Sequence, residues 1–347
     1  MLCFEERNRK KRGEPMITIT DIANKAGVAK STVSRYLNGG SVSPKTKMKI
    51  EKIIKETGYK PNPFAQSLKA RRTNLIGTII PRLDSYSTNE ALTAIDEELR
   101  KKNRQHMITN SNQDPLIEVE NIYTLAKQKV DGILLFAGAI TDAHRVAFQK
   151  IDIPIVVLGQ SVDGRACIIH NDEQAGYEMG SYIRELGHER ILLLTVTEAD
   201  IAIGQRRKKG IIRALQENSN CTWTSHETSF VFDEAYEDCK KIIQKTDATA
   251  IICLTDTIAL AAMKAIHELG LKIPNDFSLS GFGGYAAGQI VTPPITTVHY
   301  PYKKLGKLAV QTLLQSMDGG EVPELQVLSN SLHIQESTSG YHQQLDA

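Results

Sequence analysis

The chain has 347 residues, which at about 100–200 residues per domain predicts two or three domains. Hydrophobic residues make up 41% and charged residues 24%, and this ordinary composition excludes a disordered or collagen-like chain. No apolar run approaches the ~20 residues that cross a membrane, and the charged N-terminus lacks the apolar stretch of a signal peptide. We therefore expect a cytoplasmic protein without a membrane partner. The five cysteines are scattered, with no histidines at metal-ligand spacing, so we expect neither disulfides nor a metal site.

The formal net charge of +2 hides an uneven distribution along the chain. Residues 1–73 contain 17 Lys and Arg against 6 Asp and Glu, a net charge of +11, while the rest of the chain carries −9. Such a split indicates that the basic segment meets a polyanion that the acidic remainder repels. A basic tail without a fold would serve only solubility, so the interpretation depends on whether the basic segment folds.

The basic segment shows the pattern of a helix-turn-helix. Thr18 and Asp21 have the spacing of a helix N-cap, and Gly27 ends this first short helix. In a second helix, Val33 faces inward and leaves polar side chains on the outer side, which are Lys30, Ser31, Ser34 and Arg35. A third helix is predicted from Ser43 and Pro44 to Gly58. The second helix of such a motif fits the major groove of DNA and presents its side chains to base edges.

Six sequence blocks of this region, in this order, resemble the N-terminal signature of the lactose/galactose repressor family. The blocks are Ile19-Thr20-Asp21-Ile22-Ala23, Ala26-Gly27-Val28, Ser31-Thr32-Val33-Ser34-Arg35, Leu37-Asn38, Val42-Ser43-Pro44-Lys45-Thr46 and Gly58-Tyr59-Lys60-Pro61-Asn62. Buried helical hairpins often mimic a lone helix-turn-helix pattern, so the ordered set is the stronger argument. The residues expected to contact double-stranded, palindromic operator DNA are Thr18, Lys30, Ser31, Thr32, Ser34, Arg35 and Asn38.

Residues 62–73 have the start of another short helix, with Asn62 as the cap and Pro63 in the first turn. The resemblance implies a hinge helix that orders on operator DNA, in which Leu68 wedges into the minor groove, and Asn62, Ala65 and Leu68 match it. Arg72 is expected to contact phosphates. The alternative is a plain basic linker.

From Asn74 onward, apolar runs alternate with amphipathic helical stretches, as parallel strands with crossover helices do. The number of these units exceeds one ordinary sheet, which predicts an α/β body of two doubly wound lobes with a cleft between them. The family resemblance agrees, because it implies a body like that of periplasmic sugar-binding proteins.

These patterns divide the chain into five parts. We expect a disordered leader over residues 1–15, a helix-turn-helix domain over 16–61, a hinge over 62–73, an effector-binding and dimerisation body over 74–341 and a loose tail over 342–347. The codons of Arg12-Gly13-Glu14 can contain a ribosome-binding sequence, so translation of the native protein is expected to start at Met16.

The two candidate enzyme motifs each lack a feature that their chemistry requires, so we expect neither catalysis nor a cofactor. Residues 281–286 match GxGxxA, but Pro293 and Pro294 come too soon for a crossover helix, and no acidic residue follows at the spacing that binds a ribose. Residues 204–210 lack the GKS or GKT ending of a phosphate loop.

The family resemblance also implies an effector site. Asp172 stands four residues before Gly176, Arg207 three before Gly210, and Asp256 follows an apolar strand, as do residues that line the family's cleft. They belong to different strand–helix units, and we expect Asp172 and Arg207 on opposite sides of a crossover between the lobes. The further expected effector residues are Asn89, Phe230, Gly283 and Tyr302.

Each of these residues also has a purely structural interpretation. Asp256 can be a helix cap, Phe230 a core residue, and Arg207, within four consecutive basic residues, a solvated surface side chain. The chain departs from the family twice, with Thr255 where Asn is common and Gly283 where an acidic or amide residue is common. The second departure implies a changed pattern of contacts to ligand hydroxyls.

The sequence therefore predicts a dimeric transcriptional repressor of a carbohydrate-utilisation operon, released by a sugar or sugar phosphate. Short matches in the body, among them Pro81-Arg82 and Asn89-Glu90, are most similar to sucrose-operon repressors of low-GC Gram-positive bacteria. A global catabolite-control regulator with a phosphocarrier protein as corepressor is an alternative within the family. A transport-associated sugar-binding protein is an alternative from another class, which would share the body but not residues 17–72.

Overall fold

The computed structural model describes residues 17–37, 40–59 and 73–341. The chain divides into two compact units, Met1–Thr73 and Asn74–Ala347, which we call the N-terminal unit and the body. The predicted leader, the predicted tail and nearly all of the predicted hinge lie outside the described residues. Within the described part of the chain, no helix is both long and apolar enough to span a membrane.

The described residues of the N-terminal unit form three helices, α1 (Ile19–Ala26), α2 (Lys30–Leu37) and α3 (Pro44–Thr57). The predicted cap of α1 is present in full, since the Thr18 hydroxyl accepts from the Asp21 amide and the Asp21 carboxylate accepts from the Thr18 amide at 2.8 Å. Gly27 ends α1 with φ 64°, a left-handed conformation that glycine adopts without steric cost. The sequence therefore predicted these local boundaries correctly.

A small apolar core holds the three helices together. Its fully enclosed members come from all three helices and are Ile22, Ala23, Ala26, Val33 and Ile50. Because Val33 is the buried residue of α2, the opposite side of that helix is turned to solvent.

Within its described residues, 74–341, the body contains two six-stranded sheets. The first has the order β11-β5-β4-β3-β1-β2 and the second the order β12-β10-β9-β8-β6-β7. All neighbouring strands are parallel except β10 and β12, which are antiparallel. The strands of the first sheet are β1 (Leu75–Ile80), β2 (Gln105–Asn110), β3 (Gly132–Phe136), β4 (Ile155–Leu158), β5 (Ala166–His170) and β11 (Leu325–Leu328). Those of the second are β6 (Arg190–Thr195), β7 (Thr222–Glu227), β8 (Ala250–Cys253), β9 (Ser278–Gly283), β10 (Thr296–His299) and β12 (Ser331–His333).

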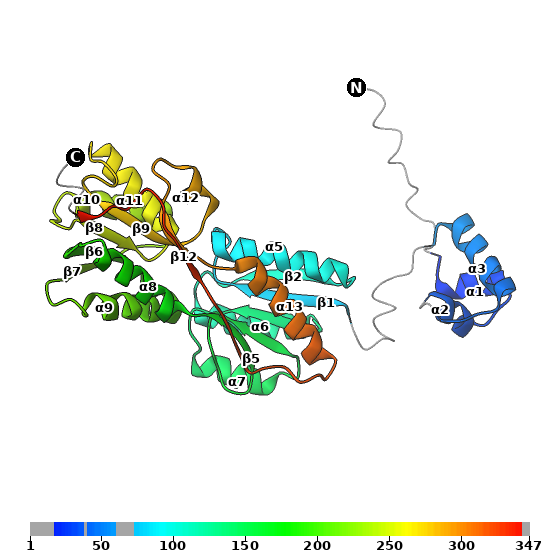
Figure 1. Ribbon diagram of the computed structural model, residues 1–347. Coiled ribbons are helices and arrows are strands. Elements are labelled where there is room, and N and C mark those ends of the chain that lie inside the picture. The colour runs from blue at the N-terminus through cyan, green and yellow to red at the C-terminus, as the bar shows by residue number, and fades with distance from the viewer. Residues whose placement is uncertain (1–16, 38–39, 60–72, 342–347) are drawn as a thin grey trace, which may run out of the picture. The chain divides into compact units, whose positions relative to one another are not determined.

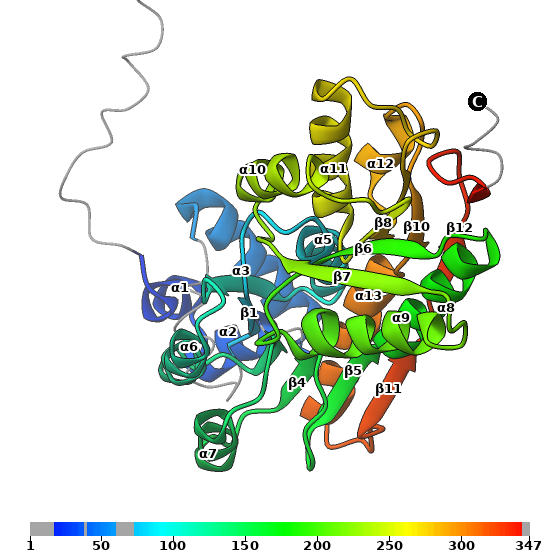
Figure 2. The same cartoon turned by 90° about the vertical axis from the view of Figure 1, so that its left-hand side faces the viewer.

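Helices cover both faces of each sheet, so each lobe has two apolar cores (Figures 1 and 2). In the first lobe the helices are α5 (Tyr86–Lys101), α6 (Pro115–Lys127), α7 (Asp142–Lys150) and α13 (Tyr302–Met317). In the second lobe they are α8 (Asp172–Glu185), the π-helical turn η1 (Ile201–Arg207), α9 (Lys208–Leu215), α10 (Phe232–Ile243), α11 (Asp256–Glu268) and α12 (Ala286–Ile290). The two-lobed α/β body predicted from the sequence is thus present.

The chain crosses between the lobes three times. It passes from β5 to α8 at Asn171, from β10 to α13 through Tyr300 and Pro301, and from β11 back to β12 near Asn330. Two of the crossing segments touch, because the Asn330 side chain donates to the Asn171 carbonyl at 3.2 Å and the Asn171 amide donates to the Leu328 carbonyl at 3.3 Å. The lobes are therefore joined at one place.

Glycines allow two helices of the second lobe to approach closely. A Cβ added at Gly176 of α8 would collide with the Arg207 carbonyl oxygen, and one added at Gly210 of α9 would collide with the Glu173 carbonyl oxygen. These are the two glycines that follow Asp172 and Arg207 in the family pattern. Their physical role here is to let α8 approach η1 and α9.

Gly176→Ala is expected to lower the free energy of unfolding of the body by about 1–3 kcal/mol, because the added methyl group forces packed backbone apart. Urea unfolding followed by circular dichroism measures the change. Gly138→Ala is the control, since a Cβ there has nothing within 4 Å. That variant should keep its stability or gain about 0.4–1 kcal/mol. Equal unfolding midpoints for the two variants would contradict the packing argument.

Candidate functional site

A cavity of about 340 Å³ lies between the two lobes of the body. Its lining follows the carboxyl ends of parallel strands, with Arg82 after β1, Phe136 at the end of β3 and His170 at the end of β5. The second lobe contributes residues that follow its own strands, including Phe230 after β7 and Thr255 after β8. Doubly wound sheets bind their ligands at this edge, and the volume falls in the usual range of about 300–1,000 Å³ for small-molecule sites.

Asp172 and Arg207 form a buried ion pair in the cavity wall. Arg207 donates to the Asp172 Oδ1 from Nε at 3.1 Å and from Nη2 at 2.6 Å, and both side chains are less than a tenth exposed. The Tyr300 hydroxyl donates to the same oxygen at 3.0 Å, and Arg207 Nη1 donates to the Leu254 carbonyl. The Arg207 guanidinium also lies 4.9 Å from the centre of the Phe282 ring and 4.8 Å from that of Tyr300. Burial opposes the charge of Arg207, but Tyr300 and Asp172 outweigh it and raise the pKa of Arg207.

The placement of this pair corrects the sequence-based expectation. Asp172 is the first residue of α8 and Arg207 the last of η1, so both belong to the second lobe rather than to opposite sides of a crossover. The helical segment that contains Arg207 begins six residues before it, at Ile201, because the Asp200 carboxylate caps η1 through the Ile203 amide at 2.8 Å. This extra turn points Arg207 inward, which also rules out the solvated interpretation.

Asp256 does not line the cavity. Its carboxylate is fully buried and accepts from the Tyr285 amide at 2.8 Å and from the Thr297 hydroxyl at 2.7 Å. Burial raises the pKa of Asp256 to about 6. The N-cap of α11 is its neighbour Thr255, whose hydroxyl accepts from the Ile258 amide at 3.2 Å. Asp256 therefore holds the loop that carries Tyr285 and lies behind the wall of the cavity.

The other expected effector residues divide into two groups. Phe230 and Tyr302 line the cavity, while Gly283 and Asn89 do not. Gly283 has φ 149°, and the space where a side chain would stand is filled by the Tyr285 ring. Asn89 is exposed, and its amide donates to the Leu83 carbonyl at 3.2 Å.

The structure adds lining residues that the sequence analysis did not select. Aromatic rings form much of the wall. Besides the expected Phe230 and Tyr302, they are Tyr86, Phe136, Tyr285 and Tyr300. Tyr86 of the first lobe and Tyr285 of the second have ring centres 4.3 Å apart. Burial lowers the pKa of His170, which also lines the cavity, to about 4, so its imidazole is neutral at neutral pH. The sequence could have indicated Arg82 and His170 by their position, because each stands where a parallel strand ends.

The N-terminal unit presents the expected polar side chains on α2. Lys30, Ser31 and Arg35 are exposed, whereas Thr32 and Ser34 are half-buried. Thr18 is exposed and caps α1. The remaining expected DNA contacts lie outside the described residues, and they are Asn38, Asn62, Ala65, Leu68 and Arg72.

Comparison with known proteins assigns this architecture. Residues 18–62 match the model described as bacterial regulatory proteins, lacI family, and residues 181–338 match a periplasmic binding protein-like domain. The sucrose operon repressor of Staphylococcus xylosus is 42% identical over 301 residues, which cover 86% of this chain and 93% of that protein. The chain belongs to the LacI family. The resemblance stated from the sequence is thereby confirmed.

Other LacI-family proteins agree in fold and extent. A crystal structure of the lac repressor dimer bound to operator and the anti-inducer ONPF has a TM-score of 0.85 and 25% identity, and covers 94% of this chain and 100% of that one. Catabolite control protein A of Priestia megaterium is 28% identical over 87% of this chain and 93% of its own length. This LacI-family chain is a DNA-binding transcriptional regulator and not an enzyme.

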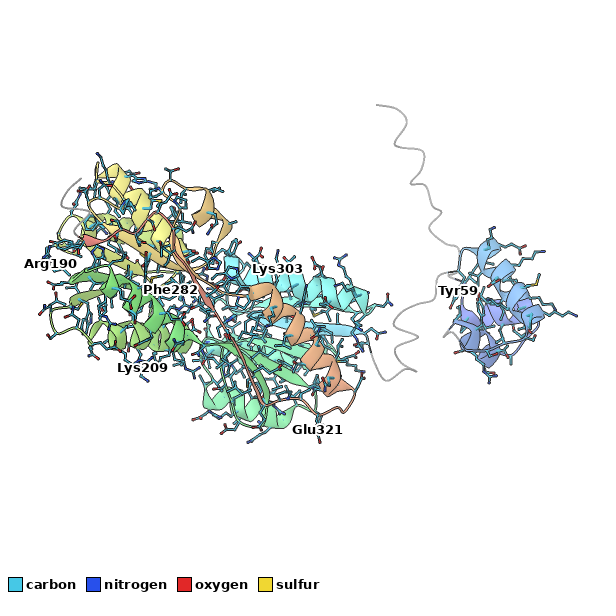
Figure 3. All side chains as sticks on the ribbon, in the orientation of Figure 1. Tyr59, Arg190, Lys209, Phe282, Lys303 and Glu321 are labelled. Carbon is cyan, nitrogen blue, oxygen red and sulfur yellow. The ribbon has the colours of Figure 1, made fainter. Side chains whose placement is uncertain are left out.

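Arg207→Ala is expected to destabilise the body by about 3–5 kcal/mol, because it leaves the Asp172 carboxylate buried without its cation. Chemical unfolding in the absence of ligand measures the effect. Lys209→Ala is the matched control, since Lys209 lies on the outside of α9 with its side chain 70% exposed (Figure 3) and pairs with Glu173 at 3.1 Å. An exposed pair of this kind contributes less than about 1 kcal/mol. If Arg207→Ala unfolds at the wild-type midpoint, the ion pair is not a structural element of the body.

Proposed function

We propose that this regulator represses a carbohydrate-utilisation operon and that a saccharide or saccharide phosphate in the interlobe cavity controls its affinity for the operator. The observation that supports this most is the cavity itself, whose lining combines aromatic rings with hydrogen-bonding side chains. Aromatic faces pack against the apolar faces of sugar rings, and carboxylate and guanidinium groups bond to their hydroxyls. The 42% identity to the Staphylococcus xylosus sucrose operon repressor favours a sucrose-type effector.

A ligand in this cavity would contact both lobes, and this is the basis of the proposed control. A ligand shifts a protein between two states only by binding one state more tightly. A ligand in the cavity could bind one arrangement of the lobes more tightly than another, because Arg82 and Tyr86 come from the first lobe while Phe230 and Tyr285 come from the second. An altered lobe arrangement would change how two copies present their DNA-binding units to a palindromic operator, with the hinge residues Asn62, Ala65, Leu68 and Arg72 in between.

The two alternatives have weaker support. A transport-associated sugar-binding protein does not account for the family match over residues 18–62. A phosphocarrier partner is supported by the 28% identity to catabolite control protein A alone, and a cavity suits a small molecule better than a protein. As a regulator of DNA, the protein would act in the cytoplasm.

Lys30→Ala is expected to weaken operator binding and to relax base preference at one operator position, since a base-contacting side chain contributes about 1–3 kcal/mol. Fluorescence anisotropy with operator and random DNA measures both effects. Lys55→Ala removes the same charge from an exposed position of α3 and should change affinity for both DNAs by one common factor. Unchanged affinity and base preference in Lys30→Ala would exclude this residue from the base-reading surface.

Phe230→Ala is expected to weaken saccharide binding roughly tenfold, because it removes an aromatic wall of the cavity, while operator binding without sugar persists. Gel shifts over a range of sucrose concentrations measure release from the operator. Phe232→Ala is the matched control, since this nearby ring at the start of α10 is exposed and does not line the cavity. Release of both variants at the wild-type sugar concentration would remove Phe230 from the effector site.

A further inference from the structure

The Arg82 side chain has an unmet hydrogen-bonding requirement at the edge of the cavity. Its Nη1 is enclosed by protein and has no hydrogen-bond partner among the described residues. The side chain is 13% exposed and lines the cavity. An enclosed guanidinium nitrogen without an acceptor costs free energy, and a ligand oxygen in the cavity would remove that cost.

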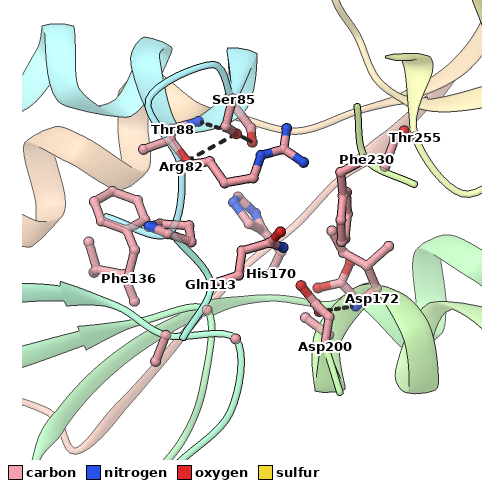
Figure 4. A pocket seen from close by; sticks show the side chains of 18 of the residues that line it. Arg82, Ser85, Thr88, Gln113, Phe136, His170, Asp172, Asp200, Phe230 and Thr255 are labelled. Atoms are coloured by element: carbon pink, nitrogen blue, oxygen red, sulfur yellow. Dashed lines mark hydrogen bonds between the residues drawn. The ribbon is translucent and has the colours of Figure 1, made fainter. Parts of the chain in front are cut away.

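The protein contacts of Arg82 leave its positive charge available. Nε donates to the Asp84 carboxylate at 2.9 Å, but Asp84 is 62% exposed and solvent weakens the pair. The guanidinium carbon lies 5.1 Å from the centre of the Phe230 ring. Figure 4 shows Arg82 extending from the first lobe toward Phe230, with His170 beneath it. The Phe230 ring and the exposed Asp84 carboxylate therefore hold the Arg82 guanidinium at the edge of the cavity.

His170 presents a second unmet requirement in the same part of the cavity. Both of its ring nitrogens are enclosed and have no hydrogen-bond partner at normal geometry in the described part of the chain, although the Asn330 amide is nearby. The imidazole is fixed between aromatic neighbours, with ring centres 5.0 Å from Tyr300 and 5.8 Å from Tyr302. It has one N–H to donate and one lone pair to accept.

The start of α5 adds hydroxyl groups beside Arg82. Ser85, Ser87 and Thr88 all line the cavity, and Ser85 caps this 16-residue helix. Helix N-termini favour negative charge, and hydroxyls donate to anionic oxygens. The start of α5 therefore adds hydrogen-bond donors beside Arg82 and His170, the two side chains whose hydrogen bonds are unmet.

The carboxylates around the cavity are all engaged by the protein. Asp172 is paired with Arg207, and the Asp200 carboxylate accepts from the Ile203 amide. Glu118, which is the carboxylate that the described residues of the first lobe contribute to the lining, lies 3.1 Å from His144 Nε2. The groups with unmet hydrogen bonds, Arg82 and His170, thus lie on the first-lobe side of the cavity. Arg82 carries a full positive charge.

We propose that Arg82 and His170 form a subsite for a phosphoryl group on the effector, so that the cavity prefers a phosphorylated saccharide to the neutral sugar. The inference rests on the proposed function and chooses between its two ligand classes. A planar guanidinium matches the oxygens of a phosphate, and such charge-assisted bonds are the strong ones. The aromatic walls would receive the sugar rings, while the ion pair of the second lobe faces their hydroxyls.

Isothermal titration calorimetry of the full chain tests the proposal with sucrose, sucrose 6-phosphate and inorganic phosphate. The wild type should bind sucrose 6-phosphate roughly ten- to a hundredfold more tightly than sucrose, as hydrogen bonds to a charged group predict. Arg82→Gln should bring the ratio close to one, and Arg82→Lys, which keeps the charge but loses the planar fork, should give an intermediate ratio. His170→Asn should reduce the ratio as well.

Arg100→Gln is the control, because Arg100 lies at the far end of α5 with its side chain 77% exposed and should keep the wild-type ratio. Thermal unfolding of each variant verifies that it folds. Equal binding of the two sugars to the wild type would overturn the subsite and leave the proposed function standing. A preference that survives Arg82→Gln would overturn the assignment to Arg82. Inorganic phosphate that binds as tightly as the sugar phosphate would overturn the link to a saccharide, and binding of neither sugar would overturn the proposed function itself.

Discussion

The buried ion pair between Asp172 and Arg207 joins the parts of the body on which the cavity depends. It links the first residue of α8 to the last residue of η1, and through Tyr300 and the Leu254 carbonyl it reaches the crossover to α13 and the end of β8. Taking two charges out of water costs several kcal/mol per ion, and the pair is retained only because its geometry and added hydrogen bonds offset that cost. The glycines that let α8 approach η1 and α9 are part of the same constraint, since a bulkier residue at Gly176 would displace the Arg207 backbone.

The same region is where the lobes are joined, so the pair lies beside the pivot of any lobe movement. Three crossing segments meet there, and His170, Tyr300 and Asn330 each belong to one of them. Away from the pivot, the lobes touch through separate contacts at the cavity, such as the Tyr86 and Tyr285 rings and the hydrogen bond of 3.1 Å from the Ile201 amide to the Gly138 carbonyl. These contacts are small and lie beside the ligand space, which is the arrangement that lets a ligand bias one lobe position over another.

The two sides of the cavity differ in whether their hydrogen-bonding groups already have partners within the protein. On the second-lobe side, Asp172 and Arg207 satisfy each other, which fixes their positions before any ligand binds. On the first-lobe side, Arg82 and His170 keep enclosed nitrogens that have no hydrogen-bond partner among the residues that the structure describes. A ligand therefore gains most by completing the first-lobe side, because there it removes an existing cost rather than competing with a formed bond. This asymmetry is the physical basis for a preference between neutral and anionic ligands.

The sequence by itself determined the features that depend on neighbours along the chain. Thr18 with Asp21 and the glycines at positions 27 and 58 set helix ends through local hydrogen bonds and backbone conformation, and the alternation of apolar runs with amphipathic stretches indicated the parallel sheets of the body. Only the tertiary structure decided the rest. β7 has little apolar sequence because it is an edge strand, so no periodicity marked it. Asp172 and Arg207 line the cavity, but both belong to the second lobe and not to opposite sides of a crossover, and Asp256 and Asn89 do not line it. Whether a charged side chain meets a ligand, a partner or solvent depends on residues distant in the chain, and local spacing carries no information about them.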